Sequence, residues 1–350
     1  MRTSIIVLLF SICAAVSQAA NTMTIYAIDS EGKAVLTIAP SGETMLEDLG
    51  WTSFGNRAST TNQVVDSLKS LGIKSIDHLV ISHFDVDHIG DISQLLTAIR
   101  VGHCYDHGDI QLAKEDNPRW AQMAEASKQH YAAYVAACNK IGRTVLKPGD
   151  KVPVKGLDVR VVHAAGKWIT KPLPGAGAPN PTCATAKQAD IVPRDLEDNA
   201  SIGLLYTYGK FRYYDGADLE GHYAHELVCP NNLIGTVDLW AVNVHGQSKG
   251  YSAAMASALK PPVVIEYNDG RMGRGNDPDV WAGLHALPKP PDIWLLHLNE
   301  RSGPEKNPPS DFVANLQAPD GMKPIKITVE KNGTFTITNE RNGFSKTYKK

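Results

Sequence analysis

The chain has 350 residues, 43 % of them hydrophobic, so it can bury a large core, and no obvious linker divides it. Its 35 Lys and Arg against 37 Asp and Glu give a net charge of -2, which predicts no general attraction to polyanions. The basic residues are scattered, apart from a small C-terminal cluster at Lys346, Lys349 and Lys350 that we interpret as a solvated tail. A strong nucleic-acid patch is therefore not expected, and nothing in the sequence identifies a partner protein.

The N-terminus has the features of a secretory signal peptide. Met1-Arg2 gives a positive start, residues 5–16 are apolar, and Ser17-Gln18-Ala19 is a small-x-small cleavage pattern before Ala20. We expect a signal peptide over residues 1–19 and a single domain over residues 20–350. No later segment approaches 18 consecutive apolar residues, so we expect the mature protein to be secreted or periplasmic, without a membrane anchor.

The first structural elements alternate between strands and helices. Residues 24–38 and 44–47 have the pattern of opening strands, and residues 61–71 that of a helix ending at Gly72. Residues 76–82 form an apolar run typical of a buried strand. Four possible metal ligands follow that strand within six residues: His83, Asp85, Asp87 and His88. Such mixed His and Asp side chains suit zinc, manganese or iron.

Two more strand ends offer ligands further along the chain. Helices are expected over 92–99 and 118–141, and residues 166–189 should form an irregular, Pro- and Gly-rich excursion. Residues 201–220 are typical of a β-hairpin, with its turn at residues 208–210 and Asp218 beyond its second strand. Residues 238–246 repeat the pattern, since a strand ends at His245 and is followed by a glycine that allows a tight turn. The C-terminal residues 322–350 contain Asn-Gly turn signals and predict an appended three-stranded β-meander.

In their order, these segments resemble the metallo-β-lactamase-fold hydrolases. The resemblance rests on TIAPSGETMLEDLGW (Thr37 to Trp51), the H-x-H-x-D-H type motif at His83 to His88, the Asp218 segment and the His-Gly at 245. It is nearest to the hydrolase domain of bacterial DNA-uptake competence proteins and their secreted relatives. The resemblance implies an α/β (α+β) fold, a four-layer αββα sandwich with two divalent metal ions at one edge of its sheets.

The resemblance also implies roles for individual residues. His83 and Asp85 would help to hold the first ion, Asp87, His88 and His245 the second, and Asp218 would bridge both. Asp87 and Asp218 would be the catalytic carboxylates, Asp87 by orienting a hydroxide or passing on its proton, and Asp218 by holding the spacing of the ions.

Three departures from the family pattern bear on these roles. Asp85 stands where many relatives have His, which shifts preference from zinc, otherwise the expected ion, toward manganese or iron. Asp91 replaces the second glycine of a Gly-Gly pair, and Val244 stands where near relatives often have the first His of a pair. The third protein ligand of the first ion is open, with His107 and His163 as candidates near strand ends.

The cysteines indicate an oxidising compartment. Four remain after removal of the signal peptide, Cys104, Cys138, Cys183 and Cys229, and they allow three pairings. If the excursion and the segment after Asp218 both border the metal edge, as the order of motifs in the resembled family implies, Cys183 pairs with Cys229. That disulfide would tether the excursion beside the site and leave Cys104 to pair with Cys138.

These observations predict a secreted metal-dependent hydrolase that uses a metal-bound hydroxide at a dinuclear site. Its substrate would be a small molecule or a phosphodiester. The alternatives are an amide or lactone hydrolase, including a β-lactamase-like enzyme, and a secreted binding protein with a degenerate metal site. The sequence does not specify the bond that is cleaved, the identity of the metal or the oligomeric state.

Overall fold

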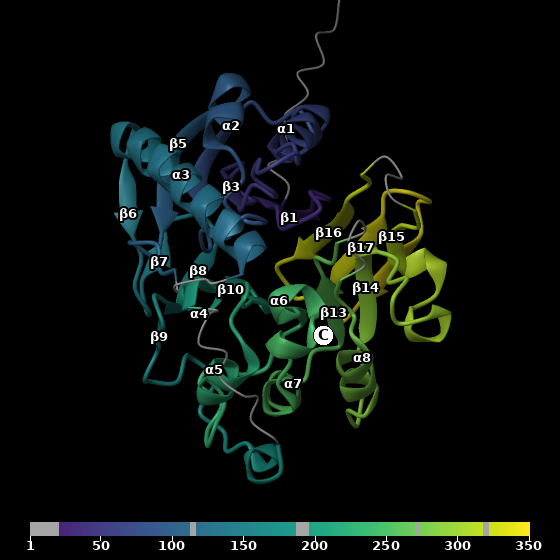
Figure 1. Ribbon diagram of the computed structural model, residues 1–350. Coiled ribbons are helices and arrows are strands. Elements are labelled where there is room, and N and C mark those ends of the chain that lie inside the picture. The colour runs from purple at the N-terminus through teal and green to yellow at the C-terminus, as the bar shows by residue number, and fades with distance from the viewer. Residues whose placement is uncertain (1–20, 113–116, 187–195, 270–273, 318–321) are drawn as a thin grey trace, which may run out of the picture.

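The computed structural model describes residues 21–112, 117–186, 196–269, 274–317 and 322–350. The predicted signal peptide lies outside these residues. Two large mixed sheets face each other, and helices lie on their outer sides (Figure 1). No helix in the described part of the chain is long and apolar enough to span a membrane.

The first sheet contains the opening strands, the motif strand and the C-terminal strands. Its members are β1 (Thr22–Ala27), β2 (Val35–Ile38), β3 (Thr44–Glu47), β4 (Ser75–Val80), β5 (Arg100–Asp106), β6 (Arg143–Val145), β16 (Ile325–Glu330), β17 (Phe335–Asn339) and β18 (Ser345–Tyr348). Their spatial order is β18-β17-β16-β1-β2-β3-β4-β5-β6. Strands β3 to β6 are parallel, and the others pair antiparallel.

The second sheet is built from the middle of the chain. Its members are β7 (Lys151–Val152), β8 (Asp158–Ala164), β9 (Lys167–Trp168), β10 (Gly203–Tyr208), β11 (Phe211–Asp215), β12 (Leu239–Ala241), β13 (Val263–Glu266), β14 (Asp292–His297) and β15 (Val313–Asn315). The main order is β15-β14-β13-β12-β11-β10-β8-β7, and β9 pairs with β8. Strands β11 to β15 are parallel, so their carboxyl ends lie along one edge.

Helices cover the outer face of each sheet. The helices beside the first sheet are α1 (Thr61–Ser70), α2 (Ile92–Ala98) and α3 (Pro118–Ile141), and those beside the second are α5 (Gly221–Glu226), α7 (Ala253–Leu259) and α8 (Pro278–His285) (Figure 1). Short turns complete the described elements: α4 (Leu196–Ala200), α6 (Asn243–Gly246), η1 (Pro181–Ala184), η2 (Ser248–Gly250), η3 (Pro304–Lys306) and η4 (Ser310–Phe312).

Three buried clusters show the layers of the fold. One lies between the sheets and joins residues such as Ile25 and Val80 to Leu204 and Val263. A second packs α1, α2 and α3 on the first sheet, and a third packs α5, α7 and α8 on the second. The predicted four-layer αββα sandwich is therefore confirmed.

Local signals in the sequence explain the longest helix. The side chain of Asn117 accepts hydrogen bonds from the backbone N–H groups of Arg119 and Trp120, which caps α3. The helix buries Tyr134 and Cys138 and ends at Gly142, whose φ of 129° interrupts the helical backbone. The prediction of a helix over 118–141 is confirmed to the residue.

The C-terminal meander is three-stranded, as predicted, but it is more than an appendage. Strand β16 pairs antiparallel with β1, placing Ile327 opposite Ile25, and so extends the first sheet. Ile325 and Val329 are fully buried in the cluster between the sheets. Because the meander completes the central core, we expect the fold to depend on it.

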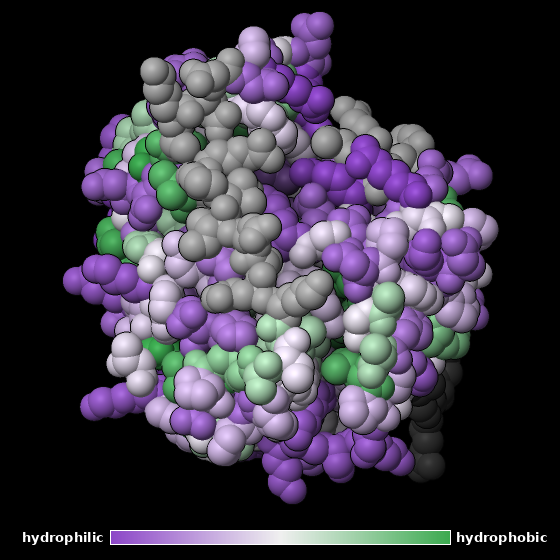
Figure 2. All heavy atoms as spheres, turned by 60° about the horizontal axis from the view of Figure 1, so that its bottom comes forward, coloured by the Kyte–Doolittle hydropathy of each residue, from purple (hydrophilic) through white to green (hydrophobic). Residues whose placement is uncertain are grey.

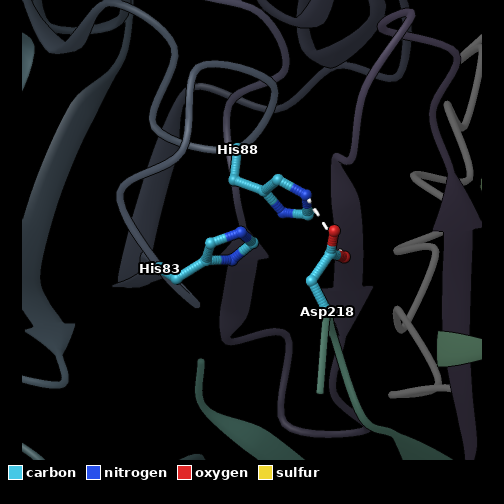
Figure 3. A group of neighbouring side chains, drawn as sticks. All are labelled: His83, His88 and Asp218. Carbon is cyan, nitrogen blue, oxygen red and sulfur yellow. Dashed lines mark ion pairs between the residues drawn. The ribbon is translucent and has the colours of Figure 1, made fainter. Parts of the chain in front are cut away.

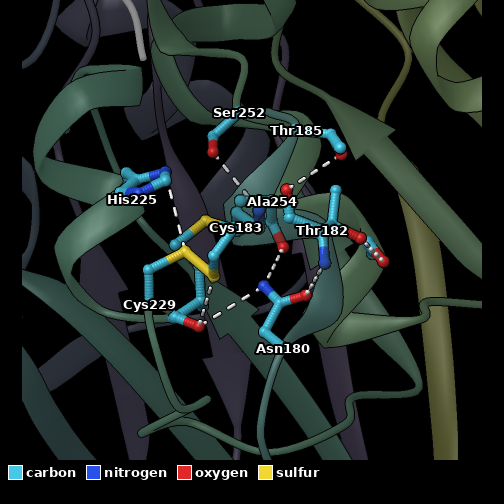
Figure 4. The surroundings of a disulfide bond; sticks show 11 residues. Asn180, Thr182, Cys183, Thr185, His225, Cys229, Ser252 and Ala254 are labelled. Atoms are coloured by element: carbon cyan, nitrogen blue, oxygen red, sulfur yellow. Dashed lines mark hydrogen bonds between the residues drawn. A yellow bond between two sulfur atoms is a disulfide. The ribbon is translucent and has the colours of Figure 1, made fainter. Parts of the chain in front are cut away.

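Both predicted disulfides are present, joining Cys104 to Cys138 and Cys183 to Cys229. Around the second bond, the irregular excursion packs on α7, since Asn180 Nδ2 donates to the carbonyl of Ala254 at 2.9 Å (Figure 4). The excursion therefore lies against the outer helical layer of the second sheet.

Figure 2 shows the face at the bottom of Figure 1 turned toward the viewer. Among the described residues, this face is mostly hydrophilic, and its hydrophobic residues form small separate groups. Of the large hydrophobic side chains described, Trp120, Val145 and Leu196 are the exposed ones. They lie on three different elements, α3, β6 and α4.

Candidate metal centre

Three segments that follow parallel strands meet at one edge of the sandwich. The loop after β4 carries His83 to His88, the turn after β11 carries Asp218, and α6 after β12 carries His245. The carboxyl ends of parallel strands are where open sheets usually bind ligands, because the chain leaves the sheet there as loops. All these side chains except Asp85 are buried.

The side chains converge closely enough to share a cation. His88 Nε2 lies 3.1 Å from His245 Nε2. The two oxygens of Asp218 divide between these rings, since Oδ1 is 3.4 Å from His88 Nε2 and Oδ2 is 3.4 Å from His245 Nε2. His83, His88 and Asp218 point into a common space (Figure 3). Asp87 completes a neighbouring group with His88 and His245.

A third group joins His83 to Asp85 and to Asp198 in α4. His83 is fully buried, yet its Nε2 has no hydrogen-bond partner in the described part of the chain and lies 3.8 Å from Asp198 Oδ1. A buried ring nitrogen without a partner is costly unless something binds it, and a cation held with Asp198 would do so. Sequence reasoning missed Asp198, although the acidic pair at Glu197 and Asp198 just before a strand was a signal that could have found it.

The two histidines considered for the third ligand position make other contacts. His107 Nε2 is 2.8 Å from Glu197 Oε1, and its ring packs against Phe84. His163 Nδ1 is 2.8 Å from the carbonyl oxygen of Ser201, and burial lowers the pKa of His163 to about 4. Neither belongs to the groups of His, Asp and Glu that could hold an ion in the described residues. Asp198, rather than either histidine, is grouped with His83 and Asp85.

Neighbouring groups orient the histidines. Asp48 Oδ2 is 2.9 Å from His88 Nδ1 and accepts a hydrogen bond from the Ser82 hydroxyl at 2.7 Å. His245 Nδ1 lies 2.8 Å from the carbonyl oxygen of Tyr267. With their Nδ1 atoms engaged in this way, both rings present Nε2 to the cluster, which is the arrangement usual for metal-binding histidines.

Backbone strain concentrates at the same place. Asp48 has φ 63°, Val244 φ 52° and His245 φ 56°, all in the left-handed region that side chains other than glycine rarely adopt. A β-branched residue such as Val244 is especially unfavourable there. Strained residues persist where the surrounding structure fixes them, commonly at functional sites.

One departure from the family pattern, Asp91 in place of a second glycine, has a local explanation. Gly90 has φ 52°, and a Cβ atom there would lie 2.4 Å from Leu49 Cβ, so this glycine is required by the turn. Asp91 follows as the N-cap of α2, accepting from Ser93 N at 3.0 Å. The second residue of the usual Gly-Gly pair is thus replaced by a helix cap.

The charges of the cluster suit a cation. Burial acts to raise the pKa of Asp218, but His245 and His88 outweigh burial and hold the pKa well below its ordinary range. Burial likewise opposes the charge on His88, yet Asp218 and Asp48 raise the pKa of His88 well above normal. A proton on His88 therefore supplies the positive charge that these carboxylates require.

Two basic side chains border the cluster. Arg274 Nη2 lies 3.0 Å from Asp87 Oδ2. Burial acts to raise the pKa of Asp87, but the positive charge of Arg274 outweighs this effect and lowers the pKa. Lys249 Nζ forms an ion pair with Asp198. Desolvation, together with the carboxylates of Asp198 and Glu197, raises the pKa of Asp85 well above its ordinary value.

A second charged cluster lies beneath the site, where the sheets meet. Lys33 is 2 % exposed, and its Nζ atom bonds to Glu47 and lies 2.9 Å from Asp215 Oδ1 and 3.7 Å from Asp48 Oδ2. Tyr206 donates a hydrogen bond to Glu47 at 2.8 Å. Because Asp48 also contacts His88, this buried cluster connects Lys33 to the candidate metal centre.

A cavity of about 260 Å³ opens onto the cluster. It is lined by ligand candidates, by α3 and by the two basic side chains: Asp85, Val86, Asp87, Leu112, Trp120, Met123, Ala124, Ser127, Glu197, Asp198, Asp218, Val244, Gln247, Lys249 and Arg274. The Cys183–Cys229 pairing is confirmed, but its predicted consequence is wrong for the described part of the excursion. None of residues 166–186 lines the cavity, because the excursion packs on α7.

A family model described as the metallo-beta-lactamase superfamily matches residues 34–182. The matched range includes the loop from His83 to His88 and ends before Asp198, Asp218 and His245, whose places are given by the structure. Residues 34–182 therefore match a metallo-β-lactamase superfamily domain, and the predicted resemblance to that superfamily is confirmed over this range.

The solved structures that are similar to this chain share little sequence identity with it. The metallo-β-lactamase-fold protein YhfI from Bacillus subtilis is 9 % identical, with 78 % of this chain and 95 % of that chain covered and a TM-score of 0.44. Tm1679, a metal-dependent hydrolase of the β-lactamase superfamily, is 12 % identical, with 78 % and 95 % covered and a TM-score of 0.42. A diphosphatase from the PhnP family is 12 % identical, with 78 % and 94 % covered and a TM-score of 0.39. No curated protein matches the chain in sequence.

The prediction of a metallo-β-lactamase-fold hydrolase is confirmed at this level of detail. The chain also has His and Asp groups able to hold divalent metal ions, as expected for the family. The expected nearness to competence proteins stays a prediction.

Proposed function

We propose that this chain is a secreted hydrolase that works with two divalent metal ions. The first ion would be held by His83, Asp85 and Asp198, the second by Asp87, His88 and His245, with Asp218 between them. The observation that carries this proposal is the position of Asp218, whose two oxygens lie 3.4 Å from the Nε2 atoms of His88 and His245. In addition, the buried Nε2 of His83 has no hydrogen-bond partner among the residues that the structure describes.

The two positions differ in their ligand chemistry. Two carboxylates and one imidazole would hold the first ion, whereas one carboxylate and two imidazoles would hold the second. Carboxylate oxygens favour harder ions such as manganese, and imidazole favours zinc and iron. We therefore expect zinc at the second position and weaker discrimination between zinc, manganese and iron at the first.

The chain's own residues suit hydrolysis. Divalent ions at such a site lower the pKa of a coordinated water and polarise a substrate oxygen. Asp87, kept ionised by Arg274, would orient the attacking water and accept its proton, and Asp218 would fix the separation of the two positions. The cavity beside them gives a substrate access to both.

A binding protein with a degenerate metal site is the alternative from another class. That hypothesis rested on Asp85 and on the lack of a third ligand for the first ion. Asp198 offers a ligand atom where the third ligand was lacking, which favours a working site over a degenerate one. Amide and lactone hydrolysis stay possible within the enzyme class, because the fold does not determine the bond.

Export is part of the proposal. Two disulfides among the described residues are unusual for a reducing compartment and fit an extracellular or periplasmic protein. Mass spectrometry of the mature N-terminus in the producing cells tests this, with Ala20 expected as the first residue. An intact Met1 on cytosolic protein would contradict export.

The enzyme proposal is tested by metal analysis and a substrate panel. Protein purified without added metal should contain close to two divalent ions per chain and should hydrolyse at least one of bis-p-nitrophenyl phosphate, a chromogenic β-lactam and a lactone. Asp218→Asn should lose at least about a hundredfold in kcat, because the bridging carboxylate holds the ions together. The matched control is Asp66→Asn, an exposed acidic residue on α1.

Two results would contradict the proposal. Asp218→Asn with unchanged turnover and unchanged metal content would refute the bridging role. A wild-type protein without bound metal that does not respond to added zinc or manganese would refute the two-ion site itself.

A further inference from the structure

The two disulfides differ in their surroundings. Cys104 and Cys138 are fully buried and join β5 to the long helix α3. Cys183 and Cys229 are only half-buried, and Cys183 lies in the short turn η1, where its neighbour Ala184 is exposed. A dissolved reductant therefore reaches the second disulfide more easily than the first, since thiol–disulfide exchange requires access to a sulfur atom.

Each sulfur of the second disulfide lies beside a polar group. Cys229 Sγ is 3.6 Å from His225 Nδ1, and Cys183 Sγ is 3.7 Å from the carbonyl oxygen of Val228 (Figure 4). A disulfide sulfur has no proton to donate, so the contact with the carbonyl becomes a hydrogen bond only when Cys183 is a thiol. The surroundings of Cys183 therefore suit the reduced form better than the oxidised form.

His225 is well placed to stabilise a thiolate on Cys229. It lies in the last turn of α5, four residues before Cys229, and the chain holds its ring beside the sulfur. A charged histidine next to a cysteine lowers the pKa of the thiol, because the ring pairs with the thiolate. A thiol of low pKa is also a good leaving group, so exchange is faster when the electrons move to that sulfur.

The path of the excursion is fixed by more than the disulfide. Four backbone hydrogen bonds of 2.7 to 2.9 Å join residues 173–180 to residues 230–233. Asn180 Nδ2 also donates to the carbonyl of Ala254 in α7 at 2.9 Å. None of these bonds involves sulfur, so we expect the protein to keep its fold when this disulfide is reduced. Cleavage is then a local change that can be reversed.

We propose that the Cys183–Cys229 disulfide is a redox-active site, which is cleaved and re-formed by exchange with a dithiol. A thiolate of the dithiol attacks Cys183 Sγ, the S–S bond breaks, and its electron pair moves to Cys229 Sγ beside His225. The second thiol of the reductant then attacks the mixed disulfide and releases Cys183. The dithiol leaves as a disulfide, and the protein gains two electrons and two protons. The site lies outside the cavity lining, so its chemistry does not depend on the proposed hydrolase.

The first test follows reduction in the folded protein. The protein, with its metal bound, is incubated with dithiothreitol without denaturant, samples are quenched with iodoacetamide, and peptide mapping measures each disulfide over time. The Cys183–Cys229 bond should open at least about a hundredfold faster than Cys104–Cys138, because a fully buried bond exchanges only after the surrounding structure opens. Circular dichroism recorded on the same samples should show that the fold persists.

The second test measures the effect of His225. His225→Phe keeps a ring but removes both nitrogens, and in a glutathione redox buffer the equilibrium should shift about tenfold toward the disulfide. A hydrogen bond to a charged group contributes about that factor. In the reduced protein, iodoacetamide should label Cys229 more slowly in this variant and Cys183 at an unchanged rate, because only the thiolate reacts. His285→Phe, at an exposed histidine in α8, is the matched control.

Two results would overturn the proposal. One is a Cys183–Cys229 bond that resists dithiothreitol in the folded protein as strongly as Cys104–Cys138 does. The other is a His225→Phe variant whose glutathione equilibrium stays within twofold of the wild type. Neither result depends on metal content or on hydrolysis, so both separate the redox-active disulfide from the proposed enzyme function.

Discussion

Replacing Lys33 by methionine should destabilise the protein severely, although Lys33 lies outside the cavity. Lys33 is 2 % exposed and is surrounded by Glu47, Asp48 and Asp215. Burial alone would lower the pKa of Lys33, but the carboxylates of Asp215 and Glu47 raise it well above normal, so the amine is charged. Methionine has a similar length and leaves three buried carboxylates without their cation.

The expected loss follows from that geometry. Removing one partner of a buried ion pair typically costs about 3 to 5 kcal/mol, because the remaining charge stays buried and unpaired. Here protonation of one carboxylate limits the cost, so we expect about 3 kcal/mol of unfolding free energy at pH 7. Asp48 also loses a neighbouring cation, and since Asp48 contacts His88, metal affinity should fall as well.

Urea denaturation of Lys33→Met, with a chelator present so that metal loss does not contribute, measures the change. Lys69→Met, at an exposed position on α1, is the control and should lose less than about 0.5 kcal/mol. A loss below about 1 kcal/mol in Lys33→Met would refute the assignment of Lys33 as the cation of a buried charge cluster.

Other predictions concern the metal, pH and the disulfide. Asp85→His should move competition between zinc and manganese toward zinc by roughly tenfold, and unaltered selectivity in equilibrium dialysis would argue that Asp85 is not a ligand. Burial, and then the Asp215 carboxylate, raise the pKa of Glu47 from 4.5 to about 8, so the folded protein binds a proton that the unfolded chain releases. The unfolding free energy of the wild type should therefore fall as the pH rises from about 5 to 8. Urea titrations at these two pH values should show a smaller fall for Glu47→Gln. Replacing both Cys183 and Cys229 by serine should lower the unfolding free energy by about 2 to 4 kcal/mol. The metal content should stay unchanged, since the disulfide lies outside the cavity lining. A loss of bound metal would indicate a direct link between the disulfide and the site.

The sequence predicted those candidate ligands whose position depends on local chain geometry. His83 and His88 directly follow a buried strand, Asp218 follows a hairpin strand, and His245 precedes a glycine with φ 76°. In each case the strand fixes the backbone, and the side chains can only emerge at the edge of the sheet. Such positions are readable from apolar runs and turn residues.

Asp198 and Lys33 could not be placed in this way, because their roles depend on contacts between distant segments. Asp198 reaches His83 from a helix of one turn, and that helix is held by Glu197, which accepts a hydrogen bond from Phe84 N at 2.7 Å. Lys33 lies in a polar stretch of sequence that is typical of an exposed loop. Only the packing of the two sheets brings Asp215, from the second half of the chain, to the amine of Lys33.

Contacts between distant segments also explain why the excursion was wrongly predicted to lie beside the metal site. Its Pro- and Gly-rich composition indicated an irregular path, and the disulfide fixed its neighbour as Cys229. Neither fact determined the side of the sheet on which it packs. The hydrogen bonds of Asn180 to α7 and to the Val228 carbonyl oxygen show that the outer layer provides that site.

The division of the candidate ligands between the two sheets has a consequence for how the molecule holds together. His83 and His88 leave the first sheet, whereas Asp198, Asp218 and His245 come with the second. An ion that binds such a set would act as a removable cross-link between two halves that are far apart in sequence. Its stabilising effect would grow with the logarithm of the free ion concentration, so resistance to unfolding and to proteolysis would follow the metal supply of the surroundings. The half-life of the protein would then be shorter where the free metal concentration is low.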